Sequence, residues 1–140
     1  MNRFISFLTS GVFLLIIACG PNLEEENKIM RAQLIDVHDE VMPKMGNLKS
    51  LEKKTSQEIK VLSNQQPVDS LRIETLKSVA YDLDQAYEGM FVWMRQYESE
   101  DGDKKPEEIQ KYLEEQMVLV TEVNQKMKDA IMRAEKELKD

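Results

Sequence analysis

The sequence has very few of the residues that catalytic and metal sites usually need. Its 140 residues include one cysteine and one histidine, so neither a disulfide within the chain nor an HExxH zinc pair can form. No glycine-rich phosphate loop and no Ser-His-acid arrangement with a recognisable elbow is present. We therefore expect a protein that is not an enzyme.

Long hydrophobic runs are also scarce. The longest apolar run, Phe4–Ile17, has 14 residues, which is short for a membrane span of ~20 but typical of a secretory signal after a basic start such as Arg3. It ends in Ile-Ile-Ala-Cys, which resembles the lipobox of bacterial lipoproteins. The resemblance implies that residues 1–18 are a signal peptide and that residues 19–21 form a lipidated N-terminus. An uncleaved N-terminal anchor is the alternative.

Lipidation would leave the chain without a free thiol, because Cys19 is the only cysteine. A thiolate metal site and a cysteine nucleophile would then both be excluded. Several acyl chains on Cys19, palmitate among them, would hold the protein to a bilayer, since each buried methylene contributes ~0.8 kcal/mol. Gly20 stands where some lipoproteins retained at the inner membrane have aspartate. This resemblance favours the outer membrane of a Gram-negative cell, with the protein in the cell envelope or periplasm.

The charge of the chain is acidic, with 19 basic and 26 acidic residues and a net charge of −7. Loss of residues 1–18 would remove only Arg3 from these, so the charge would fall to −8. Nucleic acid is excluded as a partner because its phosphates need a basic footprint. The acidic run Glu24–Glu26 also disfavours contact between the folded body and anionic lipid.

Apolar positions recur at close to the helical period of 3.6 over three segments, and no strand pattern appears. We predict helices over about 22–63, 69–98 and 106–139 in a helical domain of residues 22–140. Asn22 and Asp69 are suited to cap the first two helices, and Pro106 to open the third. The predicted fold class is all-α, an antiparallel up-down-up three-helix bundle of the coiled-coil kind.

The stretch HDEVMPKMG, residues 38–46, contains the only histidine and two methionines inside the first predicted helix. Pro43 removes a backbone donor and crowds the preceding turn, so we expect the first helix to be kinked near this residue. His38, Met42 and Met45 are spaced four and three residues apart and share one helical face.

Counting outward from the first turn places His38 level with Trp93, Met42 with Gly89 and Met90, and Met45 with Ala86. Met94 lies one residue beyond Trp93. The same counting about the second turn predicts residues 111–117 of the third helix at this height. Methionine, histidine and tryptophan from separate helices are thus expected to converge at one level.

This cluster has two main interpretations. Packing is the one we favour, because flexible methionines fill the irregular gaps that a proline kink creates. The alternative is a Cu(I) or Ag(I) site, since thioether and imidazole ligands suit these soft ions. The candidate ligands are His38, Met42, Met45, Met90 and Met94, with Trp93 covering the ion through its ring. In residue kinds alone the set resembles periplasmic Met/His/Trp copper carriers. A pH-sensing or ligand-gripping role for His38 is a third option.

HDEVMPKMG together with YEGMFVWMRQY, residues 87–97, resembles a family of short helical lipoproteins of the Bacteroidota, often labelled viral A-type inclusion protein. The resemblance implies an envelope lipoprotein with a helical fold and implies no chemistry. We expect a membrane-anchored, non-enzymatic interaction or accessory module that binds other envelope proteins and can self-associate. The alternative function is a Cu(I)/Ag(I) sensor or carrier.

Overall fold

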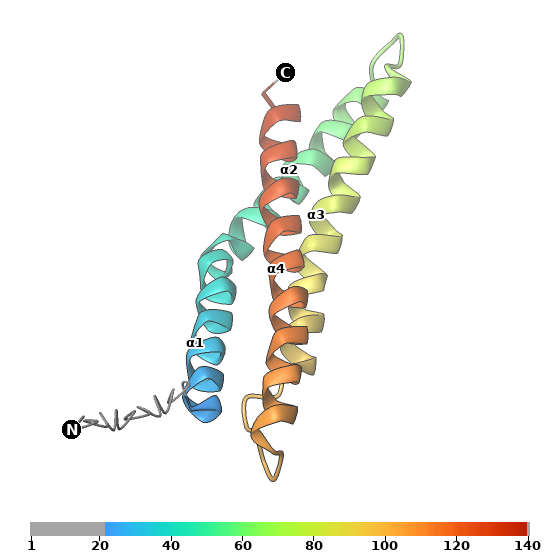
Figure 1. Ribbon diagram of the computed structural model, residues 1–140. Coiled ribbons are helices and arrows are strands. Elements are labelled where there is room, and N and C mark those ends of the chain that lie inside the picture. Colours follow the sequence, from blue (N-terminus) through green and yellow to red (C-terminus); the bar gives the residue numbers. More distant parts are fainter. Residues whose placement is uncertain (1–21, 140) are drawn as a thin grey trace, which may run out of the picture.

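The structure is a computed structural model that describes residues 22–139 (Figure 1). It is an all-helical bundle in which the chain runs up, down and up again, as the sequence predicts. Helices α1 (Leu23–Val41) and α2 (Met45–Ser63) form the first arm, α3 (Ser70–Gln96) the second and α4 (Pro106–Glu137) the third. The predicted helix ends agree with these bounds within two residues. The predicted signal peptide and lipidated Cys19 lie outside the described residues.

The expected kink in the first arm is confirmed. Met42–Lys44 form a 3-10 turn, η1, between α1 and α2, with Pro43 inside it. Proline lacks an N–H and its ring crowds the carbonyl four residues before it, so the α-helical ladder is interrupted here. The first arm therefore changes direction at this point (Figure 1).

The kink changes which neighbour the first arm packs against. Before it, α1 packs mainly on α4; after it, α2 packs mainly on α3, while α3 and α4 pack on each other along their length. Figure 1 shows α2 passing behind α4 to reach α3. The first arm thus lies obliquely across one side of the α3–α4 pair.

Local sequence signals set the helix ends. The Asn22 side chain accepts a hydrogen bond from the Glu24 N–H at the start of α1, and the Asp69 side chain accepts one from the Arg72 N–H at the start of α3. Each satisfies a backbone donor that the first helical turn leaves free. Pro106 is the first residue of α4, where a missing N–H does no harm.

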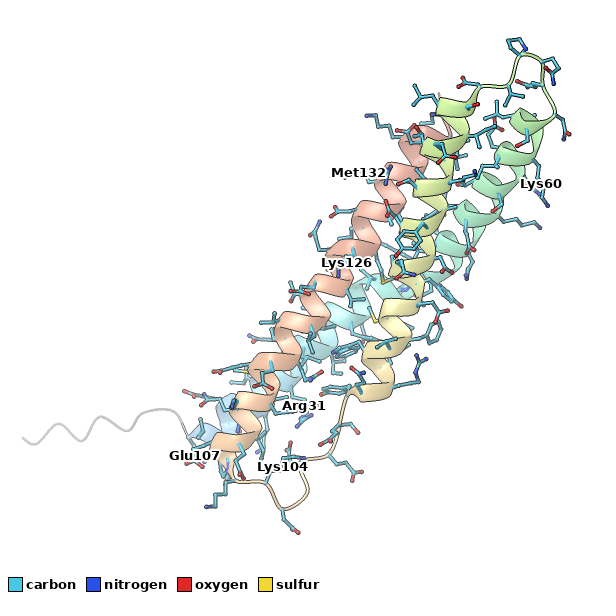
Figure 2. All side chains as sticks on the ribbon, turned by 90° about the vertical axis from the view of Figure 1, so that its right-hand side faces the viewer. Arg31, Lys60, Lys104, Glu107, Lys126 and Met132 are labelled. Carbon is cyan, nitrogen blue, oxygen red and sulfur yellow. The ribbon has the colours of Figure 1, made fainter. Side chains whose placement is uncertain are left out.

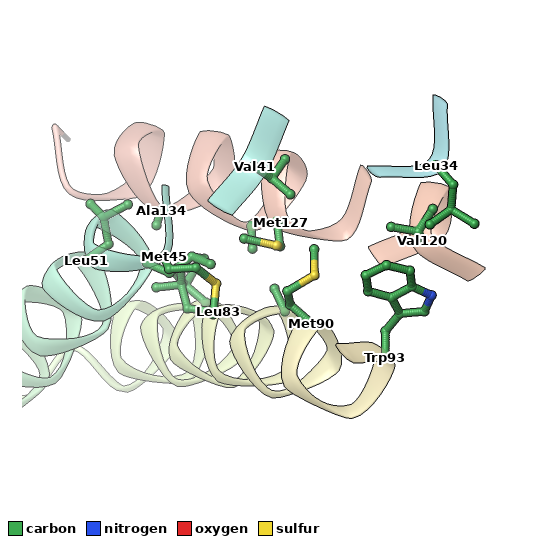
Figure 3. Close-up of a cluster of buried hydrophobic side chains, with 14 of the residues drawn as sticks. Leu34, Val41, Met45, Leu51, Leu83, Met90, Trp93, Val120, Met127 and Ala134 are labelled. Carbon is green, nitrogen blue, oxygen red and sulfur yellow. The ribbon is translucent and has the colours of Figure 1, made fainter. Parts of the chain in front are cut away.

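One continuous core runs through the bundle, and Figure 3 shows its middle. Thr55 is fully buried in the apolar stripe of α2, and its hydroxyl donates to the Leu51 carbonyl at 2.8 Å. This bond allows a polar residue to occupy a core position. No helix within residues 22–139 is long and apolar enough to cross a membrane.

Candidate functional site

The kink region brings together the histidine and the tryptophan as predicted. The ring centroids of His38 in α1 and Trp93 in α3 are 5.5 Å apart, with the rings tilted by 37°. His38 Nδ1 lies 2.8 Å from a carboxylate oxygen of Asp39, and its side chain is 17% exposed. The predicted alignment of the first two arms is therefore confirmed at this level.

The methionines divide into two environments. Met90 is fully buried and Met45 nearly so, and both belong to the packed core. Met42 and Met94 are half-buried and pack against the edge of that core. The two buried methionines thus act as core packing, while His38, Met42 and Met94 lie at the boundary of the core.

Trp93 is the largest side chain of this cluster. It is 5% exposed, and it stacks on Tyr97 with ring centroids 5.0 Å apart. Tyr97 in turn stacks on Tyr112 of α4 at 6.3 Å. The Trp93 indole N–H has no hydrogen-bond partner among the described residues. The ring therefore acts chiefly as an apolar filler, which extends an aromatic chain from α1 through α3 to α4.

The predicted height of α4 at this cluster was wrong. Gly89 lies against Val123, whose methyl carbons are 3.9 and 4.0 Å from where a Gly89 Cβ would stand. The cluster therefore faces a stretch of α4 that follows the predicted residues 111–117. The physical reason is the long connection between Gln96 and Pro106, which spans the end of the bundle asymmetrically and displaces α4 along its axis.

This displacement adds a methionine that sequence counting missed. Met127 of α4 is fully buried, and Figure 3 shows it pointing into the same part of the core as Met90. In the same view Trp93 lies beside Val120 and Leu34. The apolar periodicity of α4 marks Met127 as a core residue, but only the correct alignment places it here.

A polar clamp holds α1 to α4 just before the kink. Asn124 of α4 is 4% exposed, and its amide nitrogen donates to the Val37 carbonyl at 2.7 Å and to the Glu40 carboxylate at 2.9 Å. Lys128 approaches the same carboxylate at 2.6 Å. The hydrogen bond from Lys128, followed by that from Asn124, lowers the pKa of Glu40. Sequence patterning did not reveal this clamp. Asn124 is a polar residue in the apolar stripe of α4, and nothing in the sequence indicates that its hydrogen-bond partners lie in α1.

A second polar network ties α1 to the loop between α3 and α4. Arg31 donates to the Tyr97 hydroxyl at 2.8 Å and to the Glu98 carbonyl at 3.1 Å, and it forms an ion pair with Asp101. The Glu98 N–H donates to the Tyr112 hydroxyl at 2.6 Å. Figure 2 shows Arg31 and Lys104 at this end of the bundle. The network fixes a loop of nine residues that would otherwise be free to move.

Beside this network is a small polar pocket of about 300 Å³. Asn27 lines it, donating from its amide nitrogen to the Pro106 carbonyl at 2.8 Å, while its buried amide oxygen has no hydrogen-bond partner within residues 22–139. Lys104 also lines it and forms an ion pair with Glu98 at 2.7 Å, which lowers the pKa of Glu98 and raises the pKa of Lys104.

A larger hollow lies elsewhere, along the seam of α3 and α4 on the side away from α1, and we call it the α3–α4 groove. Its volume is about 480 Å³. Small or apolar side chains contribute to its lining: Ala86, Gly89, Val123 and Ala130. Polar and charged side chains complete it: Asp82, Gln85, Lys126, Asp129 and Arg133. Figure 2 looks onto α3 and α4 with α1 behind them and Lys126 near the middle.

Across this groove Arg133 of α4 forms an ion pair with Asp82 of α3. Asp129 lies four residues before Arg133 on α4, a spacing at which side chains of a helix can pair, but the ion-pair partner of Arg133 is Asp82 on the other helix. The groove thus has a floor of small or apolar side chains, between rims that bear charges of both signs. Such a surface suits the side chains of another helix.

Within residues 22–139 no group of three or more histidine, cysteine, aspartate or glutamate side chains is arranged to hold a metal ion. Comparison with protein-family models, with curated proteins and with solved structures finds no match to the chain. The function proposed below therefore rests on this chain's own residues.

Proposed function

We propose that this protein is a lipid-anchored, non-enzymatic helical module of the cell envelope, which binds a partner helix along the α3–α4 groove. The groove is the observation that carries the proposal. It runs along the exposed side of a bundle whose other side is covered by the first arm. Three-helix bundles that leave one such side uncovered can accept a further helix there.

The proposed lipid anchor at Cys19 would lie close to the folded bundle. Helix α1 begins at Leu23, only four residues after Cys19. Acyl chains on Cys19 would hold this end of the bundle next to the bilayer, and the acidic first turn of α1 would keep it off anionic headgroups. The groove, higher along α3 and α4, would remain accessible from the aqueous side.

The surroundings of His38 support a role other than catalysis. General acid–base chemistry needs a base positioned within reach of a bound substrate. Here the ring packs on Trp93 and its Nδ1 lies beside Asp39 on the same helix. The α3–α4 groove contains no histidine, cysteine or serine in its lining. Its small apolar floor favours the binding of side chains over the transformation of a substrate.

The anchor is tested by metabolic labelling of the full chain with a palmitate analogue in a Gram-negative host, followed by membrane fractionation. We expect label and membrane association in the wild type and loss of both in Cys19→Ala. His38→Ala is the matched control, since it lies outside the signal segment and should label normally. Equal labelling of the wild type and Cys19→Ala would contradict the proposal.

A second candidate is a Cu(I) or Ag(I) sensor or carrier built on the kink cluster. It is favoured by the contact of His38 with Trp93 and by the half-buried Met42 and Met94, which lie four residues after His38 and one residue after Trp93 in the sequence. Such a site would use His38, Met42 and Met94 at the boundary, with Met90 and Met45 reached only if the core opened. The shielded core position of those two methionines favours packing over ligation.

This candidate is tested by anaerobic Cu(I) titration of the Cys19→Ser chain while the fluorescence of Trp93, the only tryptophan, is followed. A metal site predicts stoichiometric quenching that His38→Ala and Met42→Leu abolish. Met132→Leu is the control, because Met132 is 65% exposed and lies outside the cluster. An unchanged signal at micromolar ion would eliminate the candidate.

A further inference from the structure

At one end of the α3–α4 groove, a glycine leaves a small hole with exposed aliphatic residues near it. Gly89 contributes no side chain, and the nearest side chain to the position of a Cβ there is that of Val123 of α4, at 3.9 Å. Leu119, one helical turn before Val123, is 44% exposed, and Val92, three residues after Gly89, is 41% exposed. Large aliphatic side chains next to a hole lined by small residues suit knobs-into-holes packing with another helix.

The face of α4 that borders the groove carries charges in an ordered sequence. Glu115, Leu119, Glu122 and Lys126 follow at spacings of four, three and four residues, so they form one stripe within about 60° of each other around the helix. All four are exposed. The stripe is acidic at its first residue and basic at its last.

This order makes the stripe complementary to itself when reversed. If a second α4 lies antiparallel, with the centre between Val120 and Thr121, Glu115 faces Lys126 and Leu119 faces Glu122. Lys111 then faces Ala130, and its amine lies 3.9 Å from the Glu115 carboxylate of its own chain. A second pair of opposite sign, Glu108 and Arg133, is formed farther out, although both also have partners in their own chain.

We propose that the occupant of the α3–α4 groove is a second copy of this chain, bound antiparallel about a twofold axis near Val120. This deepens the proposed function by naming the partner of the same face. In this arrangement Leu119 of the partner subunit enters the hole between Gly89 and Val123. A twofold axis makes the contact isologous, so the interaction closes at two copies and does not propagate.

Charge is the reason for choosing a second copy over an unrelated helix. The chain has a net charge of −7, so two copies repel each other over most of their surfaces. Two opposite-sign pairs, Glu115 with Lys126 and Glu108 with Arg133, each formed twice by the twofold axis, counter that repulsion only in the antiparallel alignment. In the parallel alignment Glu115 would face glutamate and Lys126 would face lysine.

Zero-length carbodiimide coupling of the full chain in detergent, followed by peptide mass spectrometry, tests the proposal directly. Glu115 and Lys126 are 11 residues apart on one straight helix, a separation of about 16 Å along the axis, so they cannot be coupled within one chain. We expect a peptide in which Glu115 is linked to Lys126, recovered from a species of twice the monomer mass.

Charge reversal then separates specific pairing from crowding in micelles. Glu115→Lys and Lys126→Glu should each weaken dimerisation at least tenfold in sedimentation experiments, and the double variant Glu115→Lys/Lys126→Glu should recover most of the loss. Glu135→Lys is the matched control, since Glu135 is exposed on another face of α4 and should leave the dimer unchanged. All variants keep the same anchor.

A chain that stays monomeric at high micromolar concentration, or a double variant that fails to recover, would overturn the proposal. In that case palmitate labelling that is lost in Cys19→Ala would still support the anchored module, with a helix of another protein in the groove. Dimer formation without labelling would contradict the anchor and leave the self-association standing. The two proposals therefore fail separately.

Discussion

The two halves of the bundle on either side of the kink are built differently. On the α1 side, aromatic rings fill the interior and buried polar groups connect the helices. On the α2 side, the interior is aliphatic, with Leu48, Leu51, Val79 and Leu83 of α2 and α3 buried in one cluster. The buried Thr55 hydroxyl there bonds within its own helix, and the ion pair between α2 and α3, Lys49 with Asp84 at 3.5 Å, lies on the surface.

The difference between the two halves follows from the change of direction of the first arm at one proline. Because the first arm turns at Pro43, α1 cannot lie against α3 as α2 does, and the space between them must be filled by larger side chains. Trp93, Tyr97 and Tyr112 fill it. The clamp at Asn124 then fixes the direction in which α1 leaves the kink.

The largest expected effect comes from removing the aromatic filler. Trp93→Ala should lower the free energy of unfolding by about 3–5 kcal/mol, because the large ring leaves a cavity that the splayed helices cannot close. Denaturant unfolding followed by circular dichroism measures it. Tyr81→Ala is the control, since Tyr81 is 64% exposed and should change stability by under about 0.5 kcal/mol. A similar loss of stability in Trp93→Ala and Tyr81→Ala would contradict the claim that the buried aromatic ring stabilises the fold more than an exposed one.

The clamp should have the next largest effect. Asn124→Ala leaves the Val37 carbonyl and Glu40 without their buried donor and should cost about 1–3 kcal/mol. Hydrogen exchange should show faster opening of α1 than of α2, since only α1 depends on the clamp. Asn47→Ala is the matched control on the exposed side of α2. Uniform acceleration across both helices would mean that the clamp does not act locally.

Two glycines give a smaller effect of opposite sign. Gly46→Ala should stabilise the fold by about 1 kcal/mol, because alanine favours a helix and nothing lies within 4 Å of the new Cβ. Gly89→Ala should stabilise it comparably, since its Cβ meets Val123 at an ordinary 3.9 Å. Thermal unfolding checks both. Only Gly89→Ala adds a methyl group to the floor of the α3–α4 groove, so only this variant should weaken the proposed dimer. Equal dimerisation of the two variants would argue against packing of a partner helix in the groove.

The smallest effect is on the pH dependence of stability. The pKa of Glu40 is lowered by its hydrogen bonds to Lys128 and Asn124, so its stabilising contribution is present above its unfolded-state pKa and is lost as the pH falls through its lower folded-state value. Thermal unfolding of the wild type and Glu40→Gln should therefore differ most at neutral pH and converge in acid. A constant difference at all pH values would contradict this role.

Much of the fold could be predicted because it depends on local patterns. Apolar periodicity fixed the three arms, Pro43 indicated the kink, and a short first turn allowed His38 to be aligned with Trp93. The height of α4 could not be predicted in the same way. The longer loop between α3 and α4 is shaped by Arg31 and Tyr112, which come from outside it. Met127 was missed for that reason.

The candidate sites differ in the same respect. The kink cluster was visible in the sequence, because its residues are chemically unusual and lie near a short turn. The α3–α4 groove is made of ordinary residues such as Ala86 and Ala130, and its hollow depends on how closely Gly89 approaches Val123. Only the packed helices reveal it.

The first arm packs on α4 before the kink and on α3 after it, and this change determines which side of α3 and α4 stays uncovered. Cross-linking within one chain tests this arrangement most directly. Carbodiimide coupling should join Glu40 of α1 to Lys128 of α4, and Lys49 of α2 to Asp84 of α3, whose charged atoms lie 2.6 and 3.5 Å apart. Both linked peptides in one monomer are the expected result. Coupling of Lys128 to an acidic residue of α2 such as Glu52, with no link to Glu40, would contradict the arrangement.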